Sequence, residues 1–379
     1  MKPRTATLLC AALLAAAPVH AEHASPAELA NNTAAPLVAG REYMVLANHP
    51  NNLSVIDLAD NTVLKTCALP DAYGPGLLQI SPDHRQAWLL NNRFGSIYGV
   101  ELDSCNVIFS ANMSLAADER TKSVLSLAIS PDGKEIYTVQ NPSRIYVDRY
   151  EVQQPRLAVY DTASGLDAKP VRTFPMPRQL SVMQTGADGT LYVAGPDVYK
   201  VDVKTGKYEV AMPILNWNRP GYGAPDVLNA WPVQTITREF AFLYTAPKFK
   251  DDKQDIASAD FVWGIMSIDL RTGAVSVADF APLTEVYFTG IRSPKNPNHL
   301  FTVLNVLRKY DIKEQKLLAS ADVGHAYYQA SVNHDGSRVY LSGTLHDIAV
   351  FDAETLEKIT TIPLPGGDQA TNTAQVFIR

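Results

Sequence analysis

The chain is poor in the residues that usually mark a metal or haem site. It has three cysteines and eight histidines in 379 residues, and no C-x-x-C-H sequence. Without that sequence, a c-type haem has no usual attachment point on this chain. The histidines show no metal-ligand spacing. The sequence therefore predicts that this chain binds no metal and no redox cofactor of its own.

Catalytic motifs and strong charge are missing as well. There is no G-x-S-x-G, no P-loop and no H-E-x-x-H, so no motif identifies a catalytic residue. Only 19% of the residues are charged, and the formal net charge is −6. A mildly acidic chain of this kind argues against nucleic acid or anionic lipid as the partner. Beyond residue 21, no apolar run is long enough to cross a membrane.

The first 21 residues have the order of a secretory signal peptide. Lys2 and Arg4 precede an apolar run that ends in Val19-His20-Ala21. This order predicts cleavage after Ala21 and a periplasmic or secreted product. A membrane anchor is the alternative, but the apolar run is too short to span a bilayer. Cleavage would remove two cations and no acid, which takes the formal charge from −6 to −8.

What the chain has instead is a repeat of short β-rich segments around a turn. The copies are 130-SPDGKEIYTVQNP-142, 81-SPDHRQAWLLNN, 186-GADGTLYVAGPD and 334-HDGSRVYLSG. Before the first of these turns, Leu125, Leu127 and Ile129 alternate with small or polar residues. That is the period of a strand with one face on a core. Asp-Gly suits a tight hairpin because both residues tolerate positive φ.

A second marker, an apolar residue followed by an acid and a turn, occurs seven times. The acids are Asp57, Glu101, Asp161, Asp202, Asp269, Asp311 and Asp352. Their spacings are 44, 60, 41, 67, 42 and 41 residues, and the two long ones contain insertions. The other four are close to the length of a four-stranded propeller blade. Seven markers predict seven blades, with the acids as turn-formers rather than catalysts.

The two ends of the repeat predict a closed ring. The stretch 41-REYMVLANHPNNL has no inner strand ahead of it, and 372-NTAQVFIR is a strand with no later partner. We therefore expect an all-β, seven-bladed β-propeller over residues 41–379, closed by the C-terminal strand joining the first blade. Residues 22–40 are interpreted as an N-terminal arm. An irregular β-sandwich, the alternative, does not explain why one strand is missing at the start of the repeat and one strand is left over at its end.

Cys67 and Cys105 remain after the predicted cleavage. In an oxidising compartment, such a pair is more often a disulfide than part of a metal site. Cys67 lies past the first marker and Cys105 just past the second. A bridge between them would tie the outer strands of neighbouring blades.

Two insertions are the most informative part of the sequence. The fifth repeat carries 215-LNWNRPGYGAPDVLNAWP and a charged loop, 248-KFKDDKQD, interpreted as a solvated loop. The third repeat carries 143-SRIYVDRYEVQQPR. Trp217, Tyr222 and Trp231 fall where a loop is expected. Aromatics on loops either anchor a partner or form satellite core, and both interpretations stay open. Long loops on a propeller indicate a face that docks another molecule.

Three histidines have predicted positions. His84 and His334 lie in or beside hairpin turns, where we expect exposed structural roles. His325 is expected on an innermost strand, within reach of the central channel. A satisfied core histidine is the alternative for His325.

Several stretches closely resemble the β subunit of quinohemoprotein amine dehydrogenase. They are 170-PVRTFPMPRQ, 191-LYVAGPDVYKVDVKTGKY, 249-FKDDKQD, 284-TEVYFTGIRSPK and 363-PLPGGDQATNTAQVFIR. The resemblance runs from about Arg41 to Arg379. It implies a seven-bladed propeller in a periplasmic heterotrimer that deaminates primary amines to aldehydes. It also implies a dihaem cytochrome c α subunit and a small γ subunit that carries cysteine tryptophylquinone.

On this resemblance, the chain is a scaffold and pocket-forming subunit, and no catalytic residue carries over to it. We expect Trp217, Tyr222, Trp231, Tyr287 and Phe288 at or near the interface with the quinone subunit. Two other functions remain open: a YVTN-type periplasmic binding propeller, and a lactonase-like propeller hydrolase.

Overall fold

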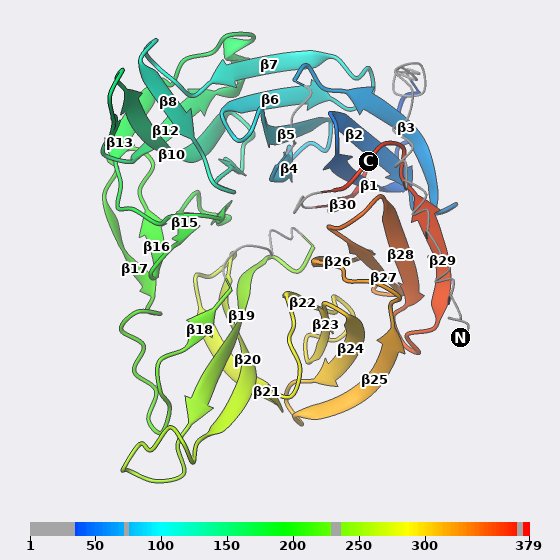
Figure 1. Cartoon of the computed structure of the whole chain (residues 1–379). Coiled ribbons are helices and arrows are strands. Elements are labelled where there is room, and N and C mark those ends of the chain that lie inside the picture. Colours follow the sequence, from blue (N-terminus) through cyan, green and yellow to red (C-terminus); the bar gives the residue numbers. More distant parts are fainter. Residues whose placement is uncertain (1–34, 72–75, 229–235, 370–373) are drawn as a thin grey trace, which may run out of the picture.

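The chain forms a ring of seven antiparallel sheets around a central axis (Figure 1). The computed structural model describes residues 35–71, 76–228, 236–369 and 374–379. These contain thirty strands and one short 3-10 helix. The predicted signal peptide and most of the expected N-terminal arm lie outside the described residues. In the part described, no helix is long and apolar enough to cross a membrane. The prediction of an all-β, seven-bladed β-propeller is confirmed.

Each blade has four principal strands, which follow one another from the axis to the rim. Blade 1 contains β30 (Gln375–Ile378), β1 (Glu42–Asn48), β2 (Asn52–Asp57) and β3 (Thr62–Ala68). Blade 2 contains β4 (Leu78–Ile80), β5 (Gln86–Asn91), β6 (Ser96–Glu101) and β7 (Val107–Asn112). Blade 3 contains β9 (Ala128–Ile129), β10 (Glu135–Ile145), β12 (Arg156–Asp161) and β13 (Arg172–Pro175). Helix η1 (Thr162–Ser164) follows β12.

The other four blades have the same order of strands. Blade 4 contains β14 (Met183–Thr185), β15 (Leu191–Ala194), β16 (Val198–Val201) and β17 (Tyr208–Met212). Blade 5 contains β18 (Asp226–Val227), β19 (Glu239–Lys248), β20 (Asp260–Asp269) and β21 (Val275–Pro282). Blade 6 contains β22 (Thr289–Arg292), β23 (His299–Val303), β24 (Val306–Asp311) and β25 (Lys316–Asp322). Blade 7 contains β26 (Gln329–Val332), β27 (Arg338–Ser342), β28 (Asp347–Asp352) and β29 (Lys358–Pro363).

The ring closes through the C-terminal strand, as predicted. β30 pairs antiparallel with β1, with Glu42 opposite Ile378 and Val45 opposite Gln375. Beyond this ladder, the Gly40 N–H donates to the Arg379 carbonyl at 2.7 Å. Blade 1 therefore takes its innermost strand from the far end of the chain, which leaves no open inner edge at the join.

The marker acids are confirmed as turn residues. Six of the seven accept a hydrogen bond from the backbone N–H two residues later, and these are Asp57, Asp161, Asp202, Asp269, Asp311 and Asp352. Glu101 differs, because its longer side chain accepts the Ser104 hydroxyl instead. The Asp132-Gly133 turn has the predicted form, with Gly133 at φ 72°. Local turn chemistry thus defines where each strand ends.

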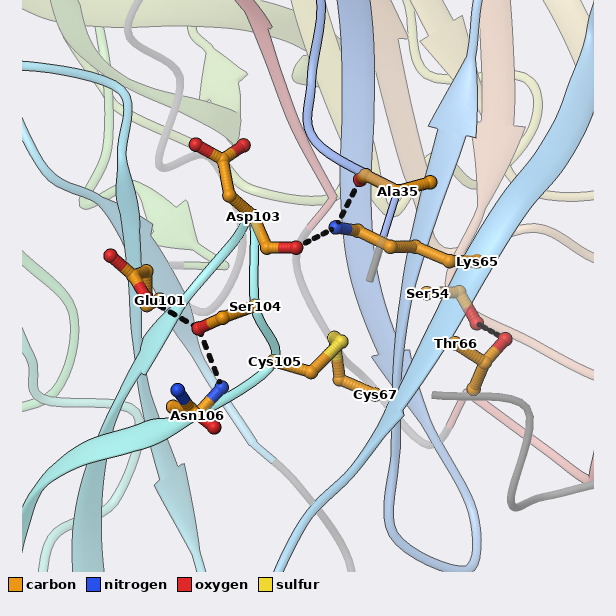
Figure 2. The surroundings of a disulfide bond; sticks show 10 residues. All are labelled: Ala35, Ser54, Lys65, Thr66, Cys67, Glu101, Asp103, Ser104, Cys105 and Asn106. Atoms are coloured by element: carbon orange, nitrogen blue, oxygen red, sulfur yellow. Dashed lines mark hydrogen bonds between the residues drawn. A yellow bond between two sulfur atoms is a disulfide. The ribbon is translucent and has the colours of Figure 1, made fainter. Parts of the chain in front are cut away.

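The disulfide between Cys67 and Cys105 joins blades 1 and 2, as predicted (Figure 2). Its two Cα atoms are 5.2 Å apart. Beside it, the nearly buried ammonium of Lys65 donates to the carbonyl oxygens of Ala35, at 2.7 Å, and Asp103, at 2.8 Å. The outer strand of one blade is therefore tied to the outer turn of the next by a covalent bond and by satisfied polar groups.

In two blades, a glycine on the third strand leaves room for a large aromatic ring that extends over it from the second strand. Gly99 lies between Trp88 and Phe109 on neighbouring strands, and a Cβ there would lie 2.8 Å from the Trp88 ring. Gly264 has the same position in blade 5, where a Cβ would lie 2.0 Å from the Tyr244 ring. Only glycine leaves room for these rings. In blade 5 this crossing brings the Tyr244 hydroxyl to β21, where it joins the network described below.

Candidate docking face

The up-and-down order of the strands gives the ring two unlike faces. The connections between second and third strands, and the crossings from blade to blade, lie at one end of the strands. We call this end the loop face. The turns between first and second strands, and between third and fourth strands, lie at the other end, the turn face. This assignment follows from the sequential antiparallel order in every blade.

The long insertions of the chain all belong to the loop face and its rim. Residues 146–155 connect β10 to β12, and 249–259 connect β19 to β20. Residues 213–225 cross from blade 4 to blade 5 and lie beside the second of these loops, since Tyr222 forms a β-bridge with Lys248. Figure 1 shows the long β19–β20 hairpin extending past the rim of the ring. The turn face also has long connections: residues 162–171 join β12 to β13 and contain helix η1, and residues 228–238 join β18 to β19, with 229–235 outside the described residues.

Exposed apolar side chains also gather on the loop-face connections. Nine large exposed hydrophobic residues lie there, and these are Leu115, Val124, Val147, Tyr150, Val152, Leu215, Ile256, Val286 and Leu345. The turn-face connections contain three, Leu166, Val171 and Leu228. Contiguous apolar side chains in water indicate a surface that another molecule covers, whereas single ones are common on any protein. The docking face stays a prediction, and this distribution favours the loop face for it.

A buried carboxylate anchors the aromatic insertion of blade 5. Asp279 on β21 is 7% exposed. It accepts hydrogen bonds from the Tyr244 hydroxyl at 2.5 Å and from the Tyr222 hydroxyl at 2.5 Å. Tyr244 comes from the same blade, whereas Tyr222 comes from the insertion. The carboxylate thus joins two parts of the chain that are far apart in sequence.

The insertion also supplies the positive charge that pairs with this carboxylate. The Arg219 guanidinium donates to Asp279 at 2.6 Å and to the Tyr244 hydroxyl at 2.8 Å. The same guanidinium lies 3.9 Å from the centre of the Tyr222 ring, which is a cation–π contact. Trp217 packs on Tyr244 with ring centres 5.4 Å apart. The insertion is therefore fixed to blade 5 by charge, hydrogen bonds and ring contacts together.

The contacts of Asp279 set its protonation state. Burial alone would raise the pKa of the Asp279 carboxyl. Hydrogen bonds from Tyr222, Tyr244 and Arg219 outweigh burial and hold that pKa below its ordinary value. The carboxylate is therefore ionised at neutral pH, because its donors favour the charged form.

The structure separates the five predicted interface aromatics. Trp217 and Tyr222 are half-buried and contact each other, with ring centres 5.9 Å apart. Tyr287 is 2% exposed and packs on Trp263 in the core between blades 5 and 6. Phe288 is half-buried and stacks on Tyr328 at 4.4 Å. Trp231 lies outside the described residues. Trp217, Tyr222 and Phe288 thus keep some surface for a partner, whereas Tyr287 is a core residue.

The position expected for His325 is wrong. The residue lies in the crossing before β26, not on an innermost strand. Gly324, at φ 82°, turns the chain just before it. The His325 ring contacts Tyr327, and its Nε2 lies 3.1 Å from the Asp347 carboxylate. His325 is thus part of a polar cluster at the loop-face end of blade 7.

The two turn histidines lie where the sequence predicts them. His84 Nδ1 lies 2.5 Å from the Ile378 carbonyl oxygen, and His334 Nδ1 lies 2.6 Å from Glu42. Both contacts reach blade 1 from a neighbouring blade. The two histidines therefore support the join of the ring.

Two hollows lie at opposite ends of the strands. One, of about 380 Å³, opens at the turn-face mouth of the central channel and is lined by Gln79, Gln184 and Arg238 among others. The other, of about 680 Å³, lies on the loop face between blades 2 and 3, with Arg120 and Lys122 in its wall. Among the described residues, no three His, Cys, Asp or Glu side chains come together in a way that could hold a metal ion.

The fold and the loop face define a β-propeller protein with one elaborated face. No family model matches the sequence, and no curated protein matches it. Among solved structures, apo AztD from Citrobacter koseri is similar at 11% identity, over 90% of this chain and 98% of that chain, with a TM-score of 0.50. Kuenenia stuttgartiensis hydrazine synthase is similar at 16% identity, over 83% of this chain and 89% of that chain, with a TM-score of 0.51. Similarity at such low identity shows the fold alone.

Proposed function

We propose that this chain is the non-catalytic propeller subunit of a periplasmic quinohemoprotein amine dehydrogenase. In this proposal the chain holds the small quinone-bearing subunit and helps to shape the pocket for a primary amine. Cysteine tryptophylquinone and c-type haem belong to the other two subunits. The chain itself contributes packing, shape and exclusion of water.

The observation that carries this proposal is the collection of insertions and exposed apolar side chains on the loop face. A face of this kind is suited to docking. Two of the stretches that resemble the amine dehydrogenase subunit are on this face. The stretch 249-FKDDKQD follows β19, and 284-TEVYFTGIRSPK begins in the crossing to blade 6. Their positions agree with a role in holding another subunit.

The anchored insertion supports the same role. Arg219 and Asp279 hold residues 213–225 in one arrangement before any partner arrives. A surface that is already ordered loses less conformational entropy on binding. Trp217 and Tyr222 are therefore presented as preformed contacts.

The test is isolation of the tagged chain from the periplasm of its source organism. We expect a haem absorbance spectrum, a positive quinone stain and amine-dependent reduction of a dye in the isolated complex. The chain produced alone should show none of the three. Recovery of the tagged wild-type chain as a monomer without haem would reject the proposal and favour the YVTN-type binding propeller.

A further inference from the structure

Blade 3 carries a small additional sheet that the propeller does not need. β8 (Glu119–Lys122) and β11 (Tyr150–Val152) pair with the outer half of β10, on either side of it. We call these three strands the ribbon. β10 itself is eleven residues long, whereas the second strand of blade 2 has six. The first half of β10 completes the blade, and its second half builds the ribbon.

The two sides of the ribbon differ in burial. Residues directly opposite each other on paired strands point to the same side. On one side, Thr121 and Pro142 are opposite each other and both are buried, whereas Arg144 and Glu151, farther along the same side, are paired and exposed. On the other side, Arg120 and Val152 both pair with Ser143. This second side faces solvent, because Arg120 and Val152 are exposed.

The solvent side of the ribbon is both apolar and cationic. Tyr150 is 75% exposed and Val152 is 63% exposed, and the two lie on the same side of β11. Arg120 and Lys122 lie on β8, on the far side of β10 from them, at positions that face the same way. Val147, at the tip of the hairpin, is fully exposed. A partner that covers these side chains would remove apolar area from water, which favours binding.

The cationic side chains continue into the hollow between blades 2 and 3. Arg93, Arg120 and Lys122 line this hollow, and the residues lining it include no carboxylate. This charge is local, since the whole chain has a net charge of −6. A local excess of cations on an acidic protein selects for acidic partner groups and speeds their association.

The acids near the ribbon decide between two classes of partner. Asp118 immediately precedes β8, and Glu119 and Glu151 lie on the ribbon strands, on the side opposite Arg120 and Val152. At the tip, Asp148 is paired with Arg149 at 3.1 Å, so the part that would enter an anionic membrane carries no net positive charge to attract it. A protein surface with separate apolar and acidic areas can match the apolar strand and the cationic strand separately. The geometry therefore favours a protein.

We propose that the ribbon is a docking site for an acidic surface of a protein partner, which covers Tyr150 and Val152 and pairs its carboxylates with Arg120 and Lys122. This inference rests on the proposed function, because the partner it names is a subunit of the same redox complex. It adds a second contact region, on blade 3, to the one proposed at blade 5.

The test compares two ribbon variants with two matched controls in the complex isolated from the source organism. The apolar variant is Tyr150→Ser with Val152→Ser, and the charge variant is Arg120→Glu with Lys122→Glu. The sequence offers a close control for the first, because Tyr208-Glu209-Val210 on the rim strand β17 repeats Tyr150-Glu151-Val152. Its control is Tyr208→Ser with Val210→Ser.

The control for the charge variant is Lys204→Glu with Lys207→Glu, in the outer turn of blade 4 on the turn face. Thermal unfolding of each variant alone checks that it is folded. If the apolar variant unfolds early, the charge variant alone decides the outcome. The measurement is the amount of haem and quinone recovered per propeller chain, at low and at high salt.

We expect each ribbon variant to weaken partner binding about tenfold or more, as for loss of central interface contacts. The effect of charge reversal should be largest at low salt. Both controls should retain wild-type recovery. Retention of haem and quinone by both folded ribbon variants would overturn the docking site and leave the proposed function standing.

Two other outcomes also overturn the inference. If the wild-type chain recovers no redox partner, both proposals fail together. If the chain instead binds vesicles of phosphatidylglycerol, and the ribbon variants abolish that binding without changing partner recovery, the ribbon is a membrane contact.

Discussion

The side-chain amide of Gln329 pairs with the backbone of Ala374 at the join of the ring. Gln329 Nε2 donates to the Ala374 carbonyl at 3.1 Å, and Gln329 Oε1 accepts from the Ala374 N–H at 2.7 Å. Gln329 is 1% exposed and lies on the innermost strand of blade 7. Ala374 immediately precedes β30. One side chain of the last blade therefore holds the strand that completes the first.

Substitution of this residue should weaken the join. We expect Gln329→Ala to lower the free energy of unfolding by about 2 kcal/mol, because two buried backbone groups lose their partners. Chemical denaturation measures the change. Gln153→Ala removes a half-buried glutamine of the blade 3 insertion, whose side-chain amide donates only locally, to Glu151, and it should be nearly neutral. Equal stability of the two variants would contradict the role assigned to Gln329.

Removal of the disulfide should destabilise the chain without changing its fold. The bridge closes a loop with a sequence separation of 38. In the chain-entropy model, a loop of that size contributes roughly 4 kcal/mol, reduced by any strain. We expect Cys67→Ser with Cys105→Ser to unfold at correspondingly lower denaturant. Two reactive thiols in the denatured, unreduced wild-type protein would show that the bridge does not form.

Asp279 should make blade 5 sensitive to acid. Its pKa is lowered in the folded protein, so its contribution to stability is complete above its unfolded pKa of about 3.9 and is lost as pH falls through the folded pKa. We expect Asp279→Asn to cost about 3 kcal/mol at neutral pH, with a smaller difference from wild type in acid. Urea unfolding across pH measures this difference.

The control for Asp279 is an exposed carboxylate in the same blade. Asp260 forms a surface ion pair with Lys250 at 3.4 Å, and Asp260→Asn should change stability by about 0.5 kcal/mol or less. If wild type and Asp279→Asn differ in free energy of unfolding by the same amount at neutral and acidic pH, stability does not depend on the ionisation of Asp279, and this prediction is wrong.

Trp217 should affect both stability and assembly. Its ring packs on Tyr222 and Tyr244 and remains half-buried. We expect Trp217→Ala to cost about 2 kcal/mol of stability, less than for a fully buried tryptophan. We also expect weaker affinity for the quinone subunit and a raised Michaelis constant for the amine. Loss of stability with normal assembly and normal kinetics would reduce Trp217 to a packing residue.

Much of the architecture follows from local sequence. The number of blades follows from the repeated alternation of apolar and polar residues, and the outer turns follow from Asp and Gly at the turn positions. The closing strand follows from a missing strand at the start of the repeat and an extra strand at its end. Each of these signals lies within a few residues. The disulfide was also predictable, because only Cys67 and Cys105 remain after the expected cleavage.

The network around Asp279 was not predictable, because it depends on an encounter between distant segments. Arg219 is 60 positions from Asp279, and Tyr244 reaches the carboxylate only because Gly264 leaves room for its ring. No local pattern specifies that encounter. His325 was misplaced for a similar reason, since contacts with Tyr327 and Asp347 hold it outside the strand. In the sequence, the ribbon is visible only as an insertion. That Arg120 and Lys122 share one side of it can be seen only from the pairing register of β8 with β10.

The join at blade 1 also fixes the order in which the protein matures. Asn48 bonds to the carbonyl of Pro365, a residue 317 positions later. During synthesis, three strands of blade 1 are therefore made long before their inner partner exists. Cys67 and Cys105 are only 38 positions apart, so their bridge does not depend on the closing strand and can join blade 1 to blade 2 while the ring is still open. Contacts as distant as that of Asn48 with Pro365 form slowly, so we expect the pairing of β30 with β1 to be a late step of folding.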